Sequence, residues 1–244
     1  MSKIVNRTLD FFEAFAEQRK PLSLTELVKV LDIPLSSCHD VVHALEERGY
    51  LYEVKQRGGY YPTARLFDIA KAIVESDPVS LRAAPVLEQL SSSLNASASL
   101  ARARGTTVTY LAVSLPADPL RFSVSVGSNA RNLYATSVGK AFLASLPPAE
   151  RKAVVDGLTL TPLTKATITS KAKLLKDIEE SQARGYFINR EESVDDALTF
   201  STRFSWSGST YILTVAGTLK RMERQQEAAA KALLAAAQEL GQRE

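Results

Sequence analysis

Cysteine and histidine are scarce in this chain of 244 residues, and their scarcity removes several kinds of chemistry. Cys38 is the single cysteine, so an intrachain disulfide cannot form. It falls on the apolar stripe of an expected helix, which favours a small core residue over the alternative, a redox-sensing thiol, because a sensor needs exposure and a neighbouring cation. His39 and His43 are the only histidines. A Ser-His-Asp triad would have to be built around that one helix, so we expect that the protein is not an enzyme. The alternative is a cryptic hydrolase.

The spacing of the two histidines matches the zinc-binding HExxH motif, but the residue after His39 is Asp40 and no third ligand is apparent. A Walker motif is absent, and no glycine-rich dinucleotide fingerprint follows an expected strand. The sequence therefore predicts neither a metal site nor a cofactor.

Long apolar runs and strong charge are also missing. No stretch approaches the length of a membrane span and the N-terminus has no apolar signal region, so we expect a cytoplasmic protein without membrane contact. The formal net charge is only +3, and residues 1–76 hold ten Lys and Arg against eleven Asp and Glu. Contact with a polyanion would therefore depend on local basicity, at Arg7, Arg19, Lys20 and a short segment at 55–59.

The most informative segment of the chain is residues 22–61, where sequence signals for helices and turns alternate. Apolar residues at helical spacing predict a first helix over 24–31, namely Leu24, Leu27, Val28 and Leu31. Ser23 and Glu26 form a capping box at its start. A second helix is expected over 35–48, with Gly49 ending it. Two strands, over 50–54 and 60–61, would then flank a glycine-containing turn to form a wing.

The exposed side of the second helix carries short hydrogen-bonding residues, which suit contact with base edges and phosphates in a DNA groove. The wing adds basic residues that suit the sugar-phosphate backbone. The candidate DNA-binding residues are Thr25, Leu35, Ser36, Ser37, His39, Asp40, His43, Lys55 and Arg57. The alternative is a winged helix that contacts protein, which the basic wing makes the weaker interpretation.

After the wing, a helix is expected over 64–76, and Asp77-Pro78 ends it at a domain boundary. Further helices are predicted over 80–94, 136–145, 149–157, 170–184 and 219–240, and strands over 97–104, 106–115, 120–126, 186–190, 197–206 and 210–216. This order predicts an α+β domain with a largely antiparallel sheet. The expected organisation is a winged helix-turn-helix domain over 1–63, a linker helix over 64–77 and an effector-binding domain over 78–244.

A candidate ligand site lies where the helix over 136–145 begins. Thr136, Ser137, Val138 and Gly139 bring backbone N–H groups, two hydroxyls and the positive end of a helix dipole together, which suits a carboxylate. A small organic acid is the ligand we expect. The alternative is that Thr136 or Ser137 only caps the helix and that Gly139 only allows close packing. Leu120 and Phe122 are candidates for an apolar wall, although alternating apolar residues of this kind more often belong to plain core.

The chain resembles the IclR family of bacterial transcriptional regulators over residues 5–222. The resemblance is carried by residues 5–10, 25–34, 45–50 and 61–63, and by the run Tyr134-Ala135-Thr136-Ser137-Val138-Gly139-Lys140-Ala141-Phe142-Leu143-Ala144. It implies a GAF-like or profilin-like effector domain and an effector cavity bordered by that run. Matched to the family, Asn189, Thr199 and Thr214 stand at pocket positions, and Ala216 stands where a second serine is usual. Asp40 departs from the basic residue that is frequent there, so the operator sequence cannot be transferred from relatives.

The resemblance also implies a ligand-responsive regulator of a catabolic operon, which we interpret as a repressor. We expect it to bind a palindromic operator in double-stranded DNA. A winged domain covers few base pairs, so we expect a homodimer, which could assemble further into a dimer of dimers. The helix over 64–76 is the candidate for holding the two winged domains. The alternative is a constitutive DNA-binding regulator that has no small-molecule effector.

Overall fold

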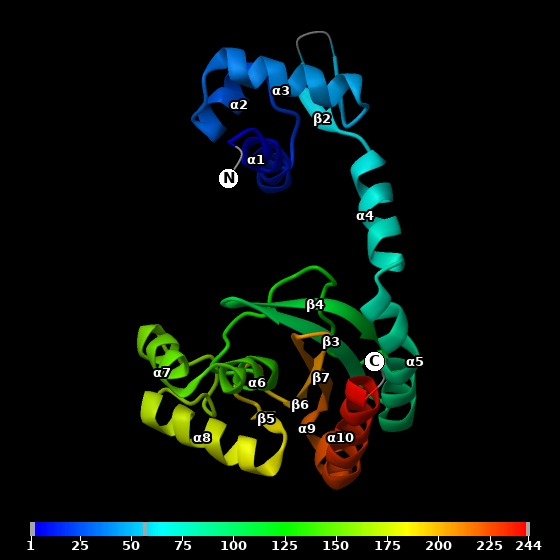
Figure 1. Ribbon diagram of the computed structural model, residues 1–244, viewed down its shortest axis with the longest axis vertical. Helices are drawn as coiled ribbons and strands as arrows, with labels where there is room; N and C mark the ends of the chain where they lie inside the picture. Colours follow the sequence, from blue (N-terminus) through cyan, green and yellow to red (C-terminus); the bar gives the residue numbers. More distant parts are fainter. Residues whose placement is uncertain (1–2, 56–57, 243–244) are drawn as a thin grey trace. The chain divides into compact units, whose positions relative to one another are not determined.

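A computed structural model describes residues 3–55 and 58–242, and the chain divides into two compact units, Met1–Glu75 and Ser76–Glu244. The first contains the helices α1 (Lys3–Gln18), α2 (Leu24–Leu31), α3 (Leu35–Glu47) and α4 (Arg65–Glu75), and the strands β1 (Leu51–Glu53) and β2 (Tyr60–Pro62) (Figure 1). The sequence analysis did not predict α1. This helix places Phe11 and Phe15 in the core of the unit.

The helix-turn-helix forms as its sequence pattern predicts. Ser23 Oγ accepts a hydrogen bond from the Glu26 N–H at 3.3 Å, and the Ser23 N–H donates to Glu26 Oε2 at 2.9 Å. Hydrogen bonds from Lys20 and Ser23 lower the pKa of Glu26 to about 2. On α3 the buried residues are Cys38, Val42 and Leu45, which pack on Leu27 of α2 and on α1. The buried side of α3 therefore faces the domain core and leaves the opposite side exposed.

The wing is a short antiparallel pair in which Leu51 lies opposite Pro62 and Glu53 opposite Tyr60. The backbone of Tyr60 also exchanges two hydrogen bonds with Leu22, at 2.9 and 3.0 Å. Gly59 makes this approach possible, since its φ is +98° and a Cβ there would lie 2.9 Å from the carbonyl carbon of Leu22. The base of the wing is thus tied to the residues that precede α2.

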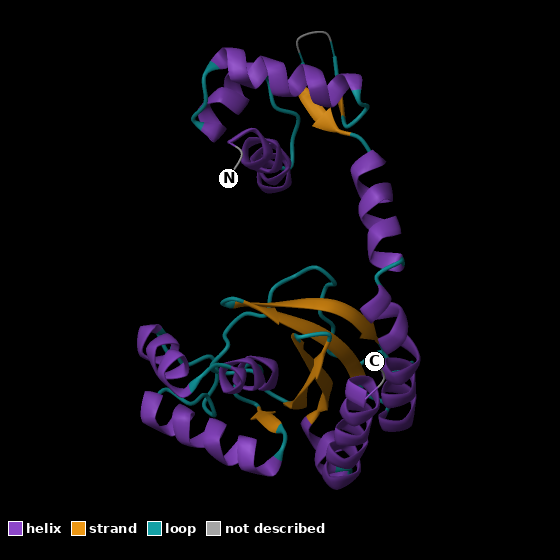
Figure 2. Ribbon diagram, viewed as in Figure 1, coloured by secondary structure: helices purple, strands orange, loops and turns teal. Residues whose placement is uncertain are grey.

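The second unit is an α+β domain built on a five-stranded antiparallel sheet in the order β4-β3-β7-β6-β5. Its strands are β3 (Ser97–Arg104), β4 (Thr107–Ser114), β5 (Phe187–Arg190), β6 (Ala197–Trp206) and β7 (Ser209–Thr218). Its helices are α5 (Pro78–Leu94), α6 (Ser137–Ser145), α7 (Pro148–Gly157), α8 (Lys171–Arg184), α9 (Leu219–Arg224) and α10 (Gln226–Gln242). The helices α5 and α10 pack on one face of the sheet, and α6 and α8 pack on the other (Figure 2). Two apolar cores result, one on each side of the sheet.

Two element predictions for this unit are wrong. Residues 120–126 form a loop rather than a strand, although Phe122 and Val124 do turn inward while the residues beside them are exposed. The edge strand β4 pairs instead with the residues just after the loop, because Tyr110 exchanges backbone hydrogen bonds with Gly127 and Ser128. The expected helix over 219–240 is divided at Gln225, whose side-chain amide donates to the Leu94 carbonyl at 2.7 Å.

Candidate functional site

The exposed side of α3 presents the side chains that the sequence analysis assigned to DNA. Leu35 is 60% exposed, and Ser36, His39, Asp40 and His43 are exposed as well. Ser37 is half-buried and lines a groove between α1 and α3, together with Asp40, Arg7 and Arg48. Thr25 is exposed at the start of α2. The side of α3 that faces away from the core thus carries short polar groups and imidazoles from Ser36 to His43, followed by the exposed carboxylates of Glu46 and Glu47.

The two histidines of α3 interact with one another and with a carboxylate rather than with a metal cluster. Their rings stack with centroids 6.2 Å apart, and His43 Nδ1 lies 3.6 Å from Glu47 Oε2. Over residues 3–55 and 58–242, no three His, Cys, Asp or Glu side chains lie close enough together to hold a metal ion. Cys38 is buried, its thiol points to the Leu24 carbonyl at 3.9 Å, and burial raises its pKa. A raised pKa and a buried sulfur are the properties of a structural cysteine.

Lys55 is exposed at the tip of the wing, and the Gly58 N–H donates to its carbonyl at 2.6 Å. Arg57, the other basic candidate of the wing, lies outside the described residues. Among the described residues of the wing, Lys55 is therefore the cation that could contact a polyanion.

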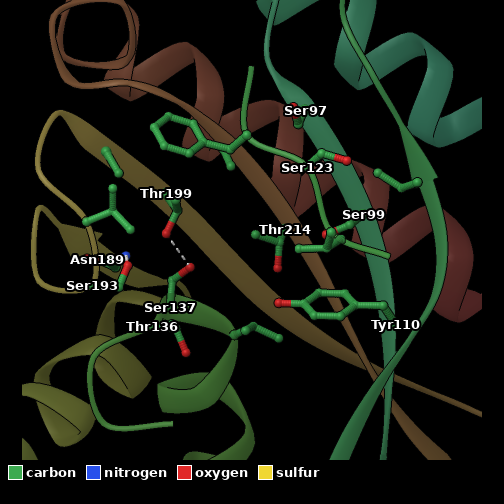
Figure 3. A pocket seen from close by; sticks show the side chains of 17 residues that line it. Ser97, Ser99, Tyr110, Ser123, Thr136, Ser137, Asn189, Ser193, Thr199 and Thr214 are labelled. Carbon is green, nitrogen blue, oxygen red and sulfur yellow. Dashed lines mark hydrogen bonds between the residues drawn. The ribbon is translucent and has the colours of Figure 1, made fainter. Parts of the chain in front are cut away.

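The second unit contains a cavity of about 180 Å³ between the sheet, the start of α6 and the loop at 120–126 (Figure 3). Seven of the nine residues predicted to bind an effector line it, namely Phe122, Thr136, Ser137, Val138, Asn189, Thr199 and Thr214. The other two, Leu120 and Gly139, do not. Leu120 is 71% exposed because the loop that carries it does not join the sheet, so its assignment to the cavity wall is wrong.

Gly139 has a packing role. A Cβ at this position would lie 2.2 Å from the carbonyl oxygen of Leu133 and 2.3 Å from its Cα, distances at which no side chain fits. Thr136 is the N-cap of α6, and its Oγ1 accepts a hydrogen bond from the Gly139 N–H at 3.2 Å. Both structural roles that the sequence analysis left open are therefore present at this helix start. The N–H groups of Ser137 and Val138 also belong to the first turn, where the helix itself supplies no acceptor, and both residues line the cavity.

Hydroxyl groups form a continuous chain beneath the start of α6. Ser137 Oγ lies 2.7 Å from Thr199 Oγ1 and accepts a hydrogen bond from Ser201 Oγ at 2.8 Å. Ser201 Oγ in turn lies 2.7 Å from Thr214 Oγ1. This chain crosses from α6 to β6 and β7, and a hydroxyl can donate or accept, so it can reorient its hydrogen bonds toward either kind of ligand group.

The lining of the cavity is uncharged and combines hydroxyl and amide groups with a larger apolar surface. Its seventeen residues include no Lys, Arg, Asp or Glu. Asn189 is fixed in place, since its Nδ2 donates to Ser193 Oγ at 2.8 Å and its Oδ1 accepts from the Glu192 N–H at 2.8 Å. Burial raises the pKa of Tyr110, which keeps its phenol neutral. A ligand in this cavity would meet neutral hydrogen-bonding groups and the dipole of α6.

The nearest buried charges stand behind the cavity wall. Lys140, in the second turn of α6, lies 2.6 Å from Glu192 Oε1 and 2.8 Å from Asp177 Oδ2, and it donates to the Ile188 carbonyl at 3.2 Å. Glu192 directly precedes Ser193 and Val194, which line the cavity. The pair with Glu192 therefore joins α6 to the loop after β5, both of which carry cavity residues, and the pair with Asp177 joins α6 to α8.

Nine further lining residues were not predicted, namely Ser97, Ser99, Tyr110, Val113, Ser123, Val124, Ser193, Val194 and Ala197, whereas Ala216 was matched to a pocket position through the family resemblance. A signal for part of the lining exists in two predicted strands, where small or polar residues alternate with apolar ones. Ser97 and Ser99 alternate with Ala98 and Leu100, and Thr214 and Ala216 flank Val215. Such alternation marks one face of a sheet, but it does not reveal that the face borders a cavity.

Comparison with known proteins assigns the family. The pattern of the "Bacterial transcriptional regulator IclR C-terminal" domain matches residues 71–242, and that of the "IclR helix-turn-helix domain" matches residues 5–55. The chain belongs to the IclR family. It is 27% identical over 241 residues to the HTH-type transcriptional regulator BhcR of Paracoccus denitrificans, covering 98% of this chain and 86% of BhcR. It is also 27% identical to the HTH-type transcriptional regulator TtgV of Pseudomonas putida, covering 95% of this chain and 88% of TtgV.

Solved structures of this family share the fold. The IclR transcriptional regulator of Alicyclobacillus acidocaldarius superposes with a TM-score of 0.79 at 20% identity, covering 99% of this chain and 98% of that one. An IclR homologue of Microbacterium hydrocarbonoxydans, complexed with 4-hydroxybenzoate, gives a TM-score of 0.76 at 20% identity and covers 98% of both chains. This chain is therefore an IclR-family DNA-binding transcriptional regulator with an N-terminal helix-turn-helix domain and a C-terminal α+β domain. None of the helices described is both long and apolar enough to span a bilayer.

Proposed function

We propose that this regulator represses a catabolic operon and that a small organic acid, bound in the cavity of the second unit, controls its affinity for operator DNA. The observation that carries the proposal is the start of α6 at the cavity. There, Ser137 and Val138 of the first turn line the cavity, the Ser137 hydroxyl lies 2.7 Å from that of Thr199, and the lining contains no charged side chain. Such a helix start favours a carboxylate, and the neutral surroundings do not repel it.

The DNA side of the proposal uses α3 and the wing. Ser36 to His43 would enter the major groove, and the 55–59 wing would contact the sugar-phosphate backbone. The exposure of His39 and Asp40, together with the burial of Cys38 and Val42 on the opposite side of α3, supports this orientation.

The regulator would bind a palindromic operator as a homodimer, because two half-sites related by two-fold symmetry need two winged domains. The face of α4 supports this. Leu66, Phe67, Ile69 and Val74 recur at helical spacing and are exposed, with Phe67 at 67%. An apolar stripe of this kind is typical of a helix that packs on a second copy. Dimers of dimers would extend the same assembly.

One relative supports an organic acid as the ligand, and another supports repression as the mode of control. One family structure holds 4-hydroxybenzoate, an aromatic acid, and the curated relative AllR of Escherichia coli, 24% identical over 172 residues, is named a repressor. A repressor of a catabolic operon that acts on the chromosome would work in the cytoplasm. Ligand binding would favour one arrangement of the two subunits, and so change the fraction of dimers able to span both half-sites.

The test is operator binding in the presence of acids. Fluorescence anisotropy with DNA from beside the gene should give a dissociation constant that rises at least fivefold with one member of a panel of small carboxylic acids. Unrelated DNA of equal length is the control at the same ionic strength, because phosphate contacts alone are strongly salt-dependent. Specific binding that no acid alters would support a constitutive regulator and contradict the proposal.

A further inference from the structure

The start of α4 is joined to the end of α3 by the side chain of Thr63. Thr63 Oγ1 donates a hydrogen bond to the Gly49 carbonyl at 2.6 Å and accepts one from the Arg65 N–H at 3.3 Å. The Thr63 N–H donates to the Tyr50 carbonyl at 2.9 Å. Gly49 and Tyr50 come directly after Arg48, the C-cap of α3, and Arg65 is the first residue of α4. One hydroxyl therefore connects the two helices.

Two side chains add to this connection. The Arg65 guanidinium lies over the ring of Tyr50, 5.3 Å from its centroid, an arrangement that favours a cation–π contact. The Tyr50 ring also makes an edge contact with Phe12 of α1, with the ring centroids 6.3 Å apart. We call Gly49, Tyr50, Thr63 and Arg65 the α3–α4 junction. This junction reaches two of the helices that form the winged domain.

The remainder of α4 adds nothing to the packed interior of the first unit. Among the eleven residues that the structure describes in α4, none is buried and none belongs to the apolar core around Phe11 and Leu27. A helix that shares no core with its neighbours takes its direction from the contacts at its end. Within the first unit, the direction of α4 relative to α3 therefore depends on the α3–α4 junction.

A small change at the junction becomes a large displacement at the far end of α4. A helix of eleven residues is about 16 Å long, so a tilt of about 20° at its start moves its end by roughly 6 Å. Adjacent base pairs are about 3.4 Å apart along DNA. If two copies associate through the exposed stripe of α4, such a tilt changes the separation of their α3 helices by roughly one to two base pairs.

We propose that Thr63 and Arg65 are positioning residues for operator binding, and that they determine which spacing of half-sites a dimer accepts. The inference rests on the proposed function and deepens it. Both residues act through α3, because the half-buried Thr63 hydroxyl is engaged by Gly49 and Arg65. A loosened junction lets each winged domain pivot on α4. The dimer then reaches several spacings but must order the junction on binding, which weakens its best site.

Fluorescence anisotropy of the full-length protein on three DNAs tests the inference. They are the operator located by footprinting in DNA from beside the gene, the same operator with a base pair inserted at its centre, and a single half-site. In the wild type we expect the insertion to weaken binding at least about tenfold. Thr63→Val keeps the side-chain shape without the hydroxyl. It should bind the operator about fivefold more weakly, lose only about threefold or less on the insertion, and bind the half-site within about twofold of the wild type.

Further variants isolate the junction. Thr63→Ser keeps the hydroxyl and should restore the wild-type discrimination. Arg65→Lys keeps the charge but lacks the planar group that lies over Tyr50, so it should relax the discrimination without changing the salt dependence of binding. Thr107→Val is the matched control. Thr107 Oγ1 also donates to a backbone carbonyl, that of Arg104 at 3.0 Å, but it lies in the second unit, so this variant should bind all three DNAs as the wild type does.

The outcomes separate this inference from the proposed function, and thermal melting and sedimentation velocity verify that each variant folds and assembles as the wild type does. A wild type that tolerates the insertion would overturn the inference. So would a Thr63→Val protein that keeps the discrimination, or one that loses affinity for half-site and operator alike. All three results leave the acid-responsive regulator standing. A wild type that binds no fragment of this DNA would contradict both. Discrimination that is lost in Thr63→Val and retained in Thr63→Ser and Thr107→Val supports the inference.

Discussion

Gly139 determines where the polar end of the cavity lies. Its missing side chain lets α6 approach the backbone of Leu133, and this approach brings the first turn of α6, with Ser137, to β6. A family motif with glycine at this position therefore has a packing cause, and the ligand site depends on that packing.

We expect Gly139→Ala to lower the free energy of unfolding by about 1–3 kcal/mol, because the new methyl group would overlap backbone atoms. Gly157→Ala is the control, since a Cβ there meets nothing within 4 Å. Urea unfolding measures both. Equal stabilities of the two variants would show that the contact with Leu133 does not constrain α6.

On the DNA side, His39→Ala and Lys55→Ala should differ in kind. Lys55 is exposed on the wing, and its loss should weaken binding to all sequences and reduce the salt slope by about one ion. His39 lies on the exposed side of α3, so its loss should change the preference among operator variants by about 1–3 kcal/mol per affected base pair. Binding titrations at several salt concentrations decide this, and identical behaviour of the two variants would contradict the division of roles.

Local chemistry made several single residues predictable. The Ser23–Glu26 capping box and the burial of Cys38 depend on sequence neighbours and helical spacing, and both are present in the structure. The place of Ser97 in the cavity wall was not predictable, because it depends on the pairing of β3 with β7, in which Ser97 lies opposite Ala216, more than a hundred residues later. Prediction from sequence therefore worked where the cause was local.

Among the elements of the second unit, Lys140 joins α6 to the loop after β5 through its ion pair with Glu192, and to α8 through its ion pair with Asp177. The position of Glu192 is unfavourable for its charge, since burial raises its pKa although Lys140 opposes the change. A carboxyl whose pKa is raised on folding contributes stability below its unfolded pKa and loses that contribution as the pH rises through the folded pKa. The loss begins near the ordinary value of 4.5.

Glu192→Gln should therefore gain stability relative to the wild type as the pH rises from about 4.5, because glutamine keeps the shape without the buried charge and Asp177 still pairs with Lys140. Chemical unfolding at a series of pH values measures the difference. Glu180→Gln, at an exposed pair with Lys176 on α8, should change stability by less than about 0.5 kcal/mol throughout. A gap between Glu192→Gln and wild type that does not vary with pH would contradict the effect of burial.

Most elements of the second unit follow from periodicity, with two instructive exceptions. The segment 120–126 alternates as a strand does, because one side of the loop faces the cavity, but its backbone pairs with no strand. The break at Gln225 has no proline or glycine to mark it and instead accompanies a side-chain contact with the end of α5. In both places the backbone conformation depends on contacts with residues that are distant in the sequence.

At the scale of the whole molecule, dimerisation through α4 has a direct test. Phe67→Asp places a charge in the exposed apolar stripe and should convert the dimer into monomers at micromolar concentration. Asp68→Asn, on the opposite side of α4, should leave the dimer intact. Sedimentation velocity distinguishes the two, and a dimer that persists in Phe67→Asp would place the interface elsewhere.

The central claim is that an acid in the cavity and DNA on α3 are coupled, and coupling must be reciprocal. The most direct measurement is the affinity for a bound acid, taken with and without saturating operator, beside the affinity for operator with and without saturating acid. We predict that both affinities fall by the same factor, at least fivefold, and that Ala216→Val abolishes both effects by blocking the cavity. An acid whose affinity is the same with and without operator would contradict the account.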